Sequence, residues 1–237
     1  MKNQYFGDFG DYQKFSLIKL LRDKGLFTIG VHWMKTHDDQ TNDGKRTGYL
    51  LVPDQWRRFE PDIFDFLKQH AQSKDLQVFQ SSELAAGLYF VDEFIDDFGK
   101  RDIAFGKVMK SPTINLVFLD PDNGIEVSST NSGNLQKYLL WQEIKDIFNT
   151  GKSVLIYQHF PRQNRQQYIY KRLLEIKKLF SAPIFAIQVK HSVYFLISQP
   201  RHVQAMQRAL NIYQNIWAEL VNIKQRQLPR NVAVALR

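Results

Sequence analysis

The residues best suited to chemistry form the group Asp120-Pro-Asp-Asn-Gly124, which directly follows the apolar run 114–119. An unbroken apolar run of this length is typical of a strand that is buried on both faces. Proline lacks the amide donor that a central strand needs, and Asp, Asn and Gly favour turns, so the strand must end here. We predict that Asp120, Asp122 and Asn123 are catalytic, because open α/β sheets bind ligands at this edge. The alternative is an ordinary strand-ending turn.

A second polar group, Tyr157-Gln-His-Phe-Pro-Arg162, ends the apolar run 153–157. A helical pattern over residues 135–149 separates the two runs. Strand, helix and strand at this length imply a right-handed crossover and a parallel pair. The carboxyl ends of the two strands would then share one edge, which brings His159 and Arg162 near the first group as further catalytic candidates. The alternative for the histidine is packing against the backbone.

A third polar group lies in the loop 34–46, which follows a predicted strand over residues 27–33. A loop rich in Asp, Asn and Gly is either a solvated turn or a ligand-binding segment. Asp11 and Lys14 stand in the first turn of a predicted helix, where an aspartate can cap the helix and anions are attracted. The polar residues of the loop are His37, Asp38, Asp39, Asn42 and Asp43.

The elements that must position these groups alternate along the chain. Helical spacing covers residues 53–72, 135–149 and 163–180, and strand patterns cover 27–33, 76–79, 114–119 and 153–157. Residues 88–98 fit either a strand or a helix. Only three residues separate the apolar runs 184–189 and 193–198, which predicts an antiparallel hairpin. Apolar residues spaced by threes and fours over residues 201–225 predict a long helix that packs on the sheet or on a second subunit, as in a homodimer.

We therefore predict one α/β domain over residues 1–237. It is a three-layer, Rossmann-like, mostly parallel sheet with an N-terminal helix in residues 1–26, a C-terminal antiparallel hairpin, a long helix at 201–225 and a basic tail at 226–237. The chain has 237 residues, 43% of them hydrophobic, which is enough for one large core. Its sequence contains no cysteine, no signal-like start and no apolar run of membrane-spanning length, so we expect a cytoplasmic protein without membrane association.

The charge is unevenly distributed along the chain. Residues 1–150 contain 18 Lys and Arg against 22 Asp and Glu, a net charge of −4. Residues 151–237 contain 14 Lys and Arg against 2 Glu, a net charge of +12. A basic half beside an acidic half suits a polyanionic partner, and we expect that partner to be a nucleic acid. The alternative is that the positive charge only aids solubility. The predicted nucleic-acid contacts on the helix 163–180 are Arg165, Lys171, Arg172, Lys177 and Lys178.

The order of elements from residue 114 onward resembles the second half of class I S-adenosylmethionine-dependent methyltransferases, and most closely the ribosomal-RNA adenine-N6 methyltransferases. Asp120 and Pro121 match the first two positions of that family's (D/N/S)-P-P-(Y/F/W) motif, whereas Asp122 and Asn123 depart from it. The resemblance implies that Asp120 and the Pro121 carbonyl accept hydrogen bonds from the exocyclic amine of a base. Methyl transfer then depends mainly on alignment of the reacting atoms.

The same resemblance implies S-adenosylmethionine as the cofactor. Thr36-His-Asp-Asp39 stands where the family has a glycine-rich loop, and Glu83 is the candidate for the ribose-binding acid. The residues assigned to the cofactor are His37, Asp38, Asp39, Asn42, Asp43, Asp11 and Lys14.

Two other functions fit the same residues. One is a metal-dependent nuclease or phosphoesterase, in which the aspartates of the loop 34–46 and of the group at 120–124 hold Mg²⁺ or Mn²⁺ and His159 and Arg162 act on water and phosphate. The spacing matches neither an EF-hand nor a HExxH motif, so we assign no metal ligands. The other is a non-catalytic module that uses a methyltransferase-like sheet to bind nucleic acid or a protein.

Overall fold

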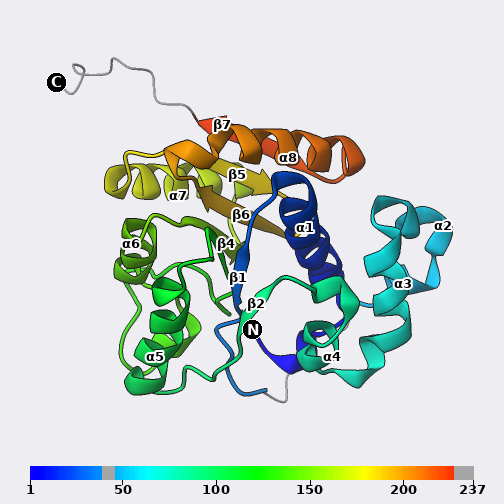
Figure 1. The fold of residues 1–237 in the computed structure, drawn as a ribbon, viewed down its shortest axis with the longest axis horizontal. Helices are drawn as coiled ribbons and strands as arrows, with labels where there is room; N and C mark the ends of the chain where they lie inside the picture. Colours follow the sequence, from blue (N-terminus) through cyan, green and yellow to red (C-terminus); the bar gives the residue numbers. More distant parts are fainter. Residues whose placement is uncertain (39–45, 227–237) are drawn as a thin grey trace.

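The computed structural model describes residues 1–38 and 46–226, and in this part of the chain seven strands form one mixed sheet (Figure 1). Their order is β2-β1-β3-β4-β6-β5-β7. The neighbours from β2 to β4 are parallel, whereas β6 is antiparallel to β4 and β5, and β7 is antiparallel to β5. The strands are β1 (Ile29–His32), β2 (Tyr89–Val91), β3 (Leu116–Leu119), β4 (Ser153–His159), β5 (Ile184–Gln188), β6 (Ser192–Ile197) and β7 (Asn222–Arg226).

The fold is α/β, and β5 and β6 form the predicted C-terminal hairpin. The pairings divide equally into three parallel and three antiparallel pairs, so the prediction of a mostly parallel sheet is not confirmed. The reason is that β6 is inserted between β4 and β5, and that a further reversed strand, β7, pairs with the outer side of β5.

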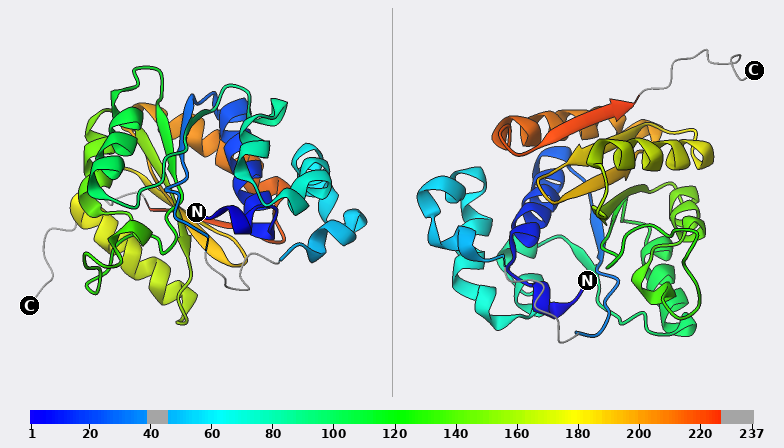
Figure 2. Two further views of the ribbon diagram at one scale, coloured as in Figure 1. Left: turned by 90° about the horizontal axis from the view of Figure 1, so that it is seen from below. Right: turned by 180° about the vertical axis from the view of Figure 1, so that it is seen from behind.

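Two layers of helices cover the sheet, as the view from below in Figure 2 shows. Helices α1, α3, α4 and α8 share one apolar cluster with the sheet, and α5, α6 and α7 share the other. Along β3, Leu116 and Phe118 face the first cluster, whereas Val117 and Leu119 face the second. The helices are α1 (Phe9–Gly25), α2 (Pro53–Trp56), α3 (Pro61–His70), α4 (Leu76–Gln80), α5 (Phe98–Lys110), α6 (Trp141–Asn149), α7 (Arg165–Leu179) and α8 (Val203–Ile216).

Two local predictions are wrong. Residues 76–79 form helix α4 rather than a strand, because Asp75 caps the helix by accepting a hydrogen bond from the backbone N–H of Gln77, 2.9 Å away. The C-terminal helix ends at Ile216 instead of extending to residue 225, and residues 222–226 become β7. Helix α5 lies in the segment 80–112, which had no firm assignment from sequence.

The apolar residues of α8 are buried inside this chain. Met206, Leu210 and Tyr213 are fully buried in the cluster that contains α1. The seam therefore packs within the protein, and a homodimer through this helix stays a prediction. None of the helices in the described part is long and apolar enough to span a bilayer.

Candidate functional site

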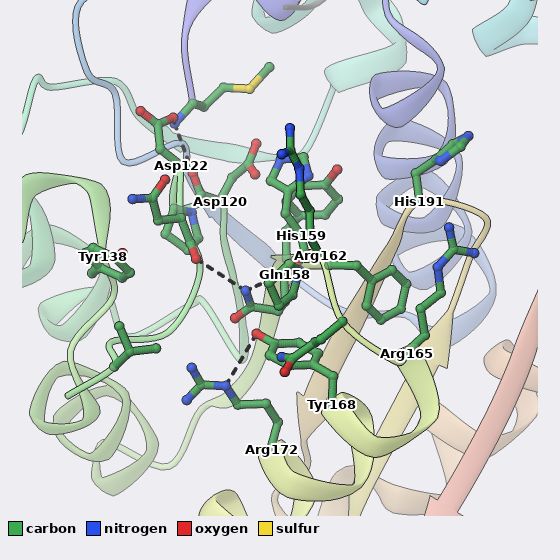
Figure 3. Close-up of a pocket in the computed structure, with 18 of the residues that line it drawn as sticks. Asp120, Asp122, Tyr138, Gln158, His159, Arg162, Arg165, Tyr168, Arg172 and His191 are labelled. Atoms are coloured by element: carbon green, nitrogen blue, oxygen red, sulfur yellow. Dashed lines mark hydrogen bonds and ion pairs between the residues drawn. The ribbon is translucent and has the colours of Figure 1, made fainter. Parts of the chain in front are cut away.

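A pocket of about 990 Å³ opens at the carboxyl ends of β3 and β4 (Figure 3). Its floor is acidic and its rim is basic and aromatic. Figure 3 shows Asp120 and Asp122 across the pocket from Arg165 and His191. Among its lining residues are Met1, Tyr5, Asp8, Lys14, Arg46, Asp120, Pro121, Asp122, Asn123, Tyr138, Tyr157, Gln158, His159, Phe160, Arg162, Arg165, Tyr168, Lys171, Arg172 and His191.

The loop after β3 is held by Gln158, the last buried residue of β4. The Gln158 amide oxygen accepts from the backbone N–H of Ile125 at 2.9 Å, and its nitrogen donates to the Asn123 carbonyl at 3.3 Å. Gly124 has a φ of +83°, and a Cβ there would lie 2.0 Å from the Gln158 nitrogen. Only glycine therefore fits this turn, which aims Asp120, Asp122 and Asn123 at the pocket.

Below the floor, Lys14 joins two buried carboxylates. Its Nζ lies 2.9 Å from Asp11 Oδ1 and 2.9 Å from Asp120 Oδ2, and 4.8 Å from the centre of the Tyr157 ring. Burial alone would lower the pKa of Lys14, but Asp11 and Asp120 raise it well above 10.5. Burial raises the pKa of Asp11 to about 7, although Lys14 opposes the shift. The floor is thus a fixed network in which Asp120 keeps a cationic partner.

Asp122 has two partners at the edge of the floor. Its Oδ1 lies 2.7 Å from the amino group of Met1, and its Oδ2 accepts a hydrogen bond from the Thr36 hydroxyl. Burial works to raise the pKa of Asp122, but the Met1 ammonium and the Thr36 hydroxyl together lower it below 3.8. The same amino group donates to the carbonyls of Met34 at 3.2 Å and Asp120 at 3.1 Å. Three oxygens therefore surround one ammonium group.

His159 lines the pocket at the end of β4, and its ring packs edge to face on the Tyr157 ring with the two ring centres 4.7 Å apart. Although the side chain is exposed to the pocket, the surrounding protein desolvates the ring, and this lowers the pKa of His159 below 6.5. The positive charge of Lys14 adds to the lowering, whereas Asp120 opposes it. The imidazole is consequently neutral at pH 7 and has a nitrogen lone pair free to accept a proton.

Exposed cations form the rim. Arg162, Arg165 and Lys171 are exposed and line the pocket, and Arg165 lies over the Phe160 ring at 5.3 Å. None of the three has a carboxylate partner among the ion pairs of the described residues. These charges are therefore available to a ligand.

Three of the predicted nucleic-acid contacts do not belong to the exposed rim. Arg172 is buried and donates to the carbonyls of Ile125 and Glu126 and to the Glu175 carboxylate at 2.8 Å. Its charge ties α7 to the loop after β3, so the prediction of an exposed phosphate contact is corrected. Lys177 and Lys178 occupy the last turn of α7, away from the residues that line the pocket.

The predicted cofactor residues do not gather at one place. His37 is exposed, stacks on the Phe94 ring at 4.4 Å and lies 3.5 Å from Asp96. Asp38 accepts from the backbone N–H of Gln4. Asp39, Asn42 and Asp43 lie outside the described residues. Among the assigned residues that the structure describes, only Lys14 lines the pocket, and it pairs there with the buried Asp11.

Glu83, the predicted ribose-binding acid, does not follow a strand as that role requires. Glu83 begins a short helical turn before β2, at the amino end of that strand. Asp92 is the residue at the carboxyl end of β2, where it lies 3.2 Å from Lys35 and accepts from the Gln80 amide.

The residues present fit the amino end of S-adenosylmethionine. The Met34 and Asp120 carbonyls and the Asp122 carboxylate are the kind of oxygen acceptors that an α-ammonium group requires. Met1 engages all three, and its sulfur lies 3.4 Å from Lys14 Nζ. A cofactor at this place would therefore have to displace Met1.

The side chains of the described residues do not support the hypothesis of a metal-dependent nuclease or phosphoesterase. No three His, Asp or Glu side chains converge there as metal ligands. Asp120 and Asp122 are each paired with a cation instead. Asp39 and Asp43 of the proposed set lie outside the described residues.

No protein-family model matches this chain, and no curated protein is similar to it in sequence. Solved structures that match this chain include the following two. Protein LPL1258 from Legionella pneumophila str. Philadelphia 1, described by the family model DUF519, is 10% identical over 94% of this chain and 98% of its own, with a TM-score of 0.47. Human methyltransferase-like protein 13 in complex with SAH is 12% identical over 85% and 92%, with a TM-score of 0.34.

Sequence reasoning missed several residues of the pocket. Gln158 could have been found, because it is a polar residue that directly follows the apolar run of its strand. Gly124, directly after the polar group at 120–123, signals a turn that such a side chain could hold. Arg46 and His191 come from two loops whose meeting only the fold determines. No pattern in the sequence pointed to Met1, and Thr36 was named only as part of the loop that stands at the place of the family's glycine-rich loop.

Proposed function

We propose that this protein is a methyltransferase-like enzyme that acts on a nucleic acid and uses S-adenosylmethionine. One observation carries the proposal: a single pocket combines an acidic floor at the ends of two parallel strands with a basic and aromatic rim. Such a pocket suits a base taken out of its stack, because the floor can bond to polar groups of the base and the rim can bind phosphates.

The floor would hold an exocyclic amine as the methyl acceptor. Asp120 and the carbonyl of Pro121 accept hydrogen bonds from this amine, as the family resemblance implies. Lys14 and Asp11 keep Asp120 in position. His159, with its lowered pKa, is available to take the proton that the amine loses. Phe160 lies in the pocket wall and can stack on the base, the role of the aromatic residue that the 120–123 motif lacks.

S-adenosylmethionine, when bound, supplies an electrophilic methyl group. The Met34 and Asp120 carbonyls and the Asp122 carboxylate would hold its ammonium group once Met1 has left them. Chain residues then do the remaining work: they orient the acceptor nitrogen and exclude water from the pocket.

The test is transfer of a labelled methyl group. The wild-type protein, incubated with labelled S-adenosylmethionine and single-stranded RNA or DNA, is expected to label one of them. The Asp120→Asn variant should lose most of this methyl transfer, because it lacks the carboxylate that orients the amine. Asp102→Asn changes an exposed aspartate on α5 and should remain fully active. Absence of cofactor binding at millimolar concentration in a calorimetric titration would contradict the proposal.

A non-catalytic nucleic-acid-binding module is the second candidate, and the position of Met1 favours it. In that case Met1 keeps the three oxygens permanently, and the cofactor never binds. Nucleic-acid binding without cofactor binding or label transfer would support this candidate. Metal-dependent cleavage that disappears in Asp120→Asn would instead revive the nuclease alternative.

A further inference from the structure

A second, smaller hollow adjoins the main pocket. Its volume is about 190 Å³, and Arg46 and His191 line both cavities. The remaining walls come from the start of α1, from residues 48–49, from the end of α2 and from the turn between β5 and β6. The lining residues are Phe9, Arg46, Gly48, Tyr49, Trp56, Lys190 and His191.

Three aromatic rings form the apolar part of this hollow, and they hold one another in place. Phe9 contacts Tyr49 edge to face at 5.2 Å and Trp56 at 4.9 Å. The Tyr49 hydroxyl donates to the Gly7 carbonyl at 3.3 Å, and the Trp56 carbonyl accepts from the Tyr12 hydroxyl at 2.8 Å. The walls are thus formed before any ligand arrives, which lowers the entropy cost of binding.

Cations lie at the boundary between the two cavities. Arg46 and Lys190 are exposed, and His191 is half-buried. Arg46 and His191 line both cavities, and Lys190 lines the smaller one. Burial lowers the pKa of His191, and the charges of Arg46, Lys190 and Arg165 lower it further. Asp8 is the carboxylate that opposes them. The boundary is therefore positive although the floor of the main pocket is acidic.

Size and charge together restrict the occupant. Pockets for drug-sized ligands span about 300–1,000 Å³, so a hollow of about 190 Å³ suits one planar ring system rather than a second cofactor. Aromatic walls stack on any nucleobase, and cations beside them bind the backbone phosphate. A base must be unpaired to enter such a hollow.

We propose that the hollow binds the base next to the nucleotide in the main pocket, with the linking phosphate on Arg46, Lys190 and His191. The inference rests on the proposed function in one respect, that the substrate is a nucleic acid. It adds that the strand is single and that recognition extends over two neighbouring nucleotides.

The test compares two probes, adenosine monophosphate and a fluorescent single-stranded RNA decamer of random sequence. Trp56→Ala should weaken decamer binding about 5- to 150-fold, the loss expected for one stacked base. It should leave the binding of adenosine monophosphate in the main pocket unchanged, because Trp56 does not line that pocket. Trp56→Phe keeps an aromatic wall and should retain the decamer.

Lys190→Glu serves as the second variant, because its side chain is exposed in a turn and the change does not touch the core. It should weaken decamer binding and reduce the salt dependence of that binding, again without an effect on the mononucleotide. Lys178→Glu, an exposed lysine at the far end of α7, is the matched control and should behave as wild type.

The outcomes separate the two proposals. Unchanged decamer binding in both Trp56→Ala and Lys190→Glu overturns the second subsite and leaves the proposed function intact. Equal weakening of both probes by Trp56→Ala also overturns it, because the residue would then support the main pocket only. Binding of neither probe by the wild-type protein overturns the proposed function and the subsite together.

Discussion

The floor and the rim of the main pocket use charge in opposite ways. On the floor, Asp11, Lys14 and Asp120 are all buried and paired with one another. On the rim, Arg162 and Lys171 are exposed and have no ion-pair partner among the described residues. The contrast teaches that the charges of the floor are committed to the fold, whereas those of the rim are left for a ligand. Substitutions on the floor should therefore affect stability first, and substitutions on the rim should affect binding first.

The largest effect is expected from Lys14→Met. The substitution leaves Asp11 and Asp120 buried without a counter-charge, which costs about 3–5 kcal/mol of unfolding free energy. Urea denaturation at pH 8, where Asp11 is ionised, measures the loss. Lys19→Met is the matched control on the same helix: its ion pairs are partly exposed, so the loss should stay below about 1 kcal/mol. Equal losses would show that the floor is not a committed network.

A smaller loss is expected from Gly124→Ala. A side chain at this position meets both a positive φ and the Gln158 amide, whereas Gly87 has a similar φ of +79° and nothing within 4 Å. Gly87→Ala should therefore cost about 1–2 kcal/mol for the backbone alone. Gly124→Ala should cost about 1–3 kcal/mol more for the clash. Urea denaturation of both variants checks the difference, and equal costs would mean that Gln158 yields without penalty.

On the rim, Arg162→Ala and Lys171→Ala should change binding without changing stability. Each substitution removes one phosphate contact, so the slope of log K against log salt for a single-stranded oligonucleotide should fall by about 0.7. Lys177→Ala, at the other end of α7, is the control and should keep the wild-type slope. Fluorescence anisotropy at several salt concentrations makes the measurement. A control that behaves like the two rim variants would extend the binding surface along the whole helix.

A pH dependence of stability also separates Asp11 from the rim. The pKa of Asp11 rises from 3.8 to about 7 on folding, so the folded state binds more protons than the unfolded state between these values. Stability from this group is therefore lost as the pH rises from about 4 to 7. Asp11→Asn should flatten that decline in unfolding free energies measured at pH 5 and pH 8. An unchanged decline would assign it to other groups.

Prediction from the sequence was most successful where a short local pattern is compatible with only one kind of structure. The apolar run at 114–119 followed by proline specified a strand buried on both faces and its end, and both are confirmed in β3. The three residues between two apolar runs specified the hairpin of β5 and β6. These predictions succeeded because the deciding interactions lie within a few residues of one another.

Predictions that depended on distant partners were less successful. Whether Arg172 meets solvent or the loop after β3 depends on a partner 46 positions earlier in the chain, and its pattern on the helix is the same in either case. Strand β7 forms because β5 presents a free edge, which no property of residues 222–226 reveals. The second hollow likewise requires α2 to meet the turn at 190–191, so no local pattern could predict it.

The position of β1 between β2 and β3 has a consequence for how the protein is made. Its two partners are β2 and β3, at residues 89–91 and 116–119, so neither is present when β1 leaves the ribosome. At about 5–20 residues per second, translation needs roughly 3–11 seconds before the first of them is complete. During that interval the nascent chain carries an unpaired hydrophobic strand, and early synthesis is when it most needs protection by chaperones.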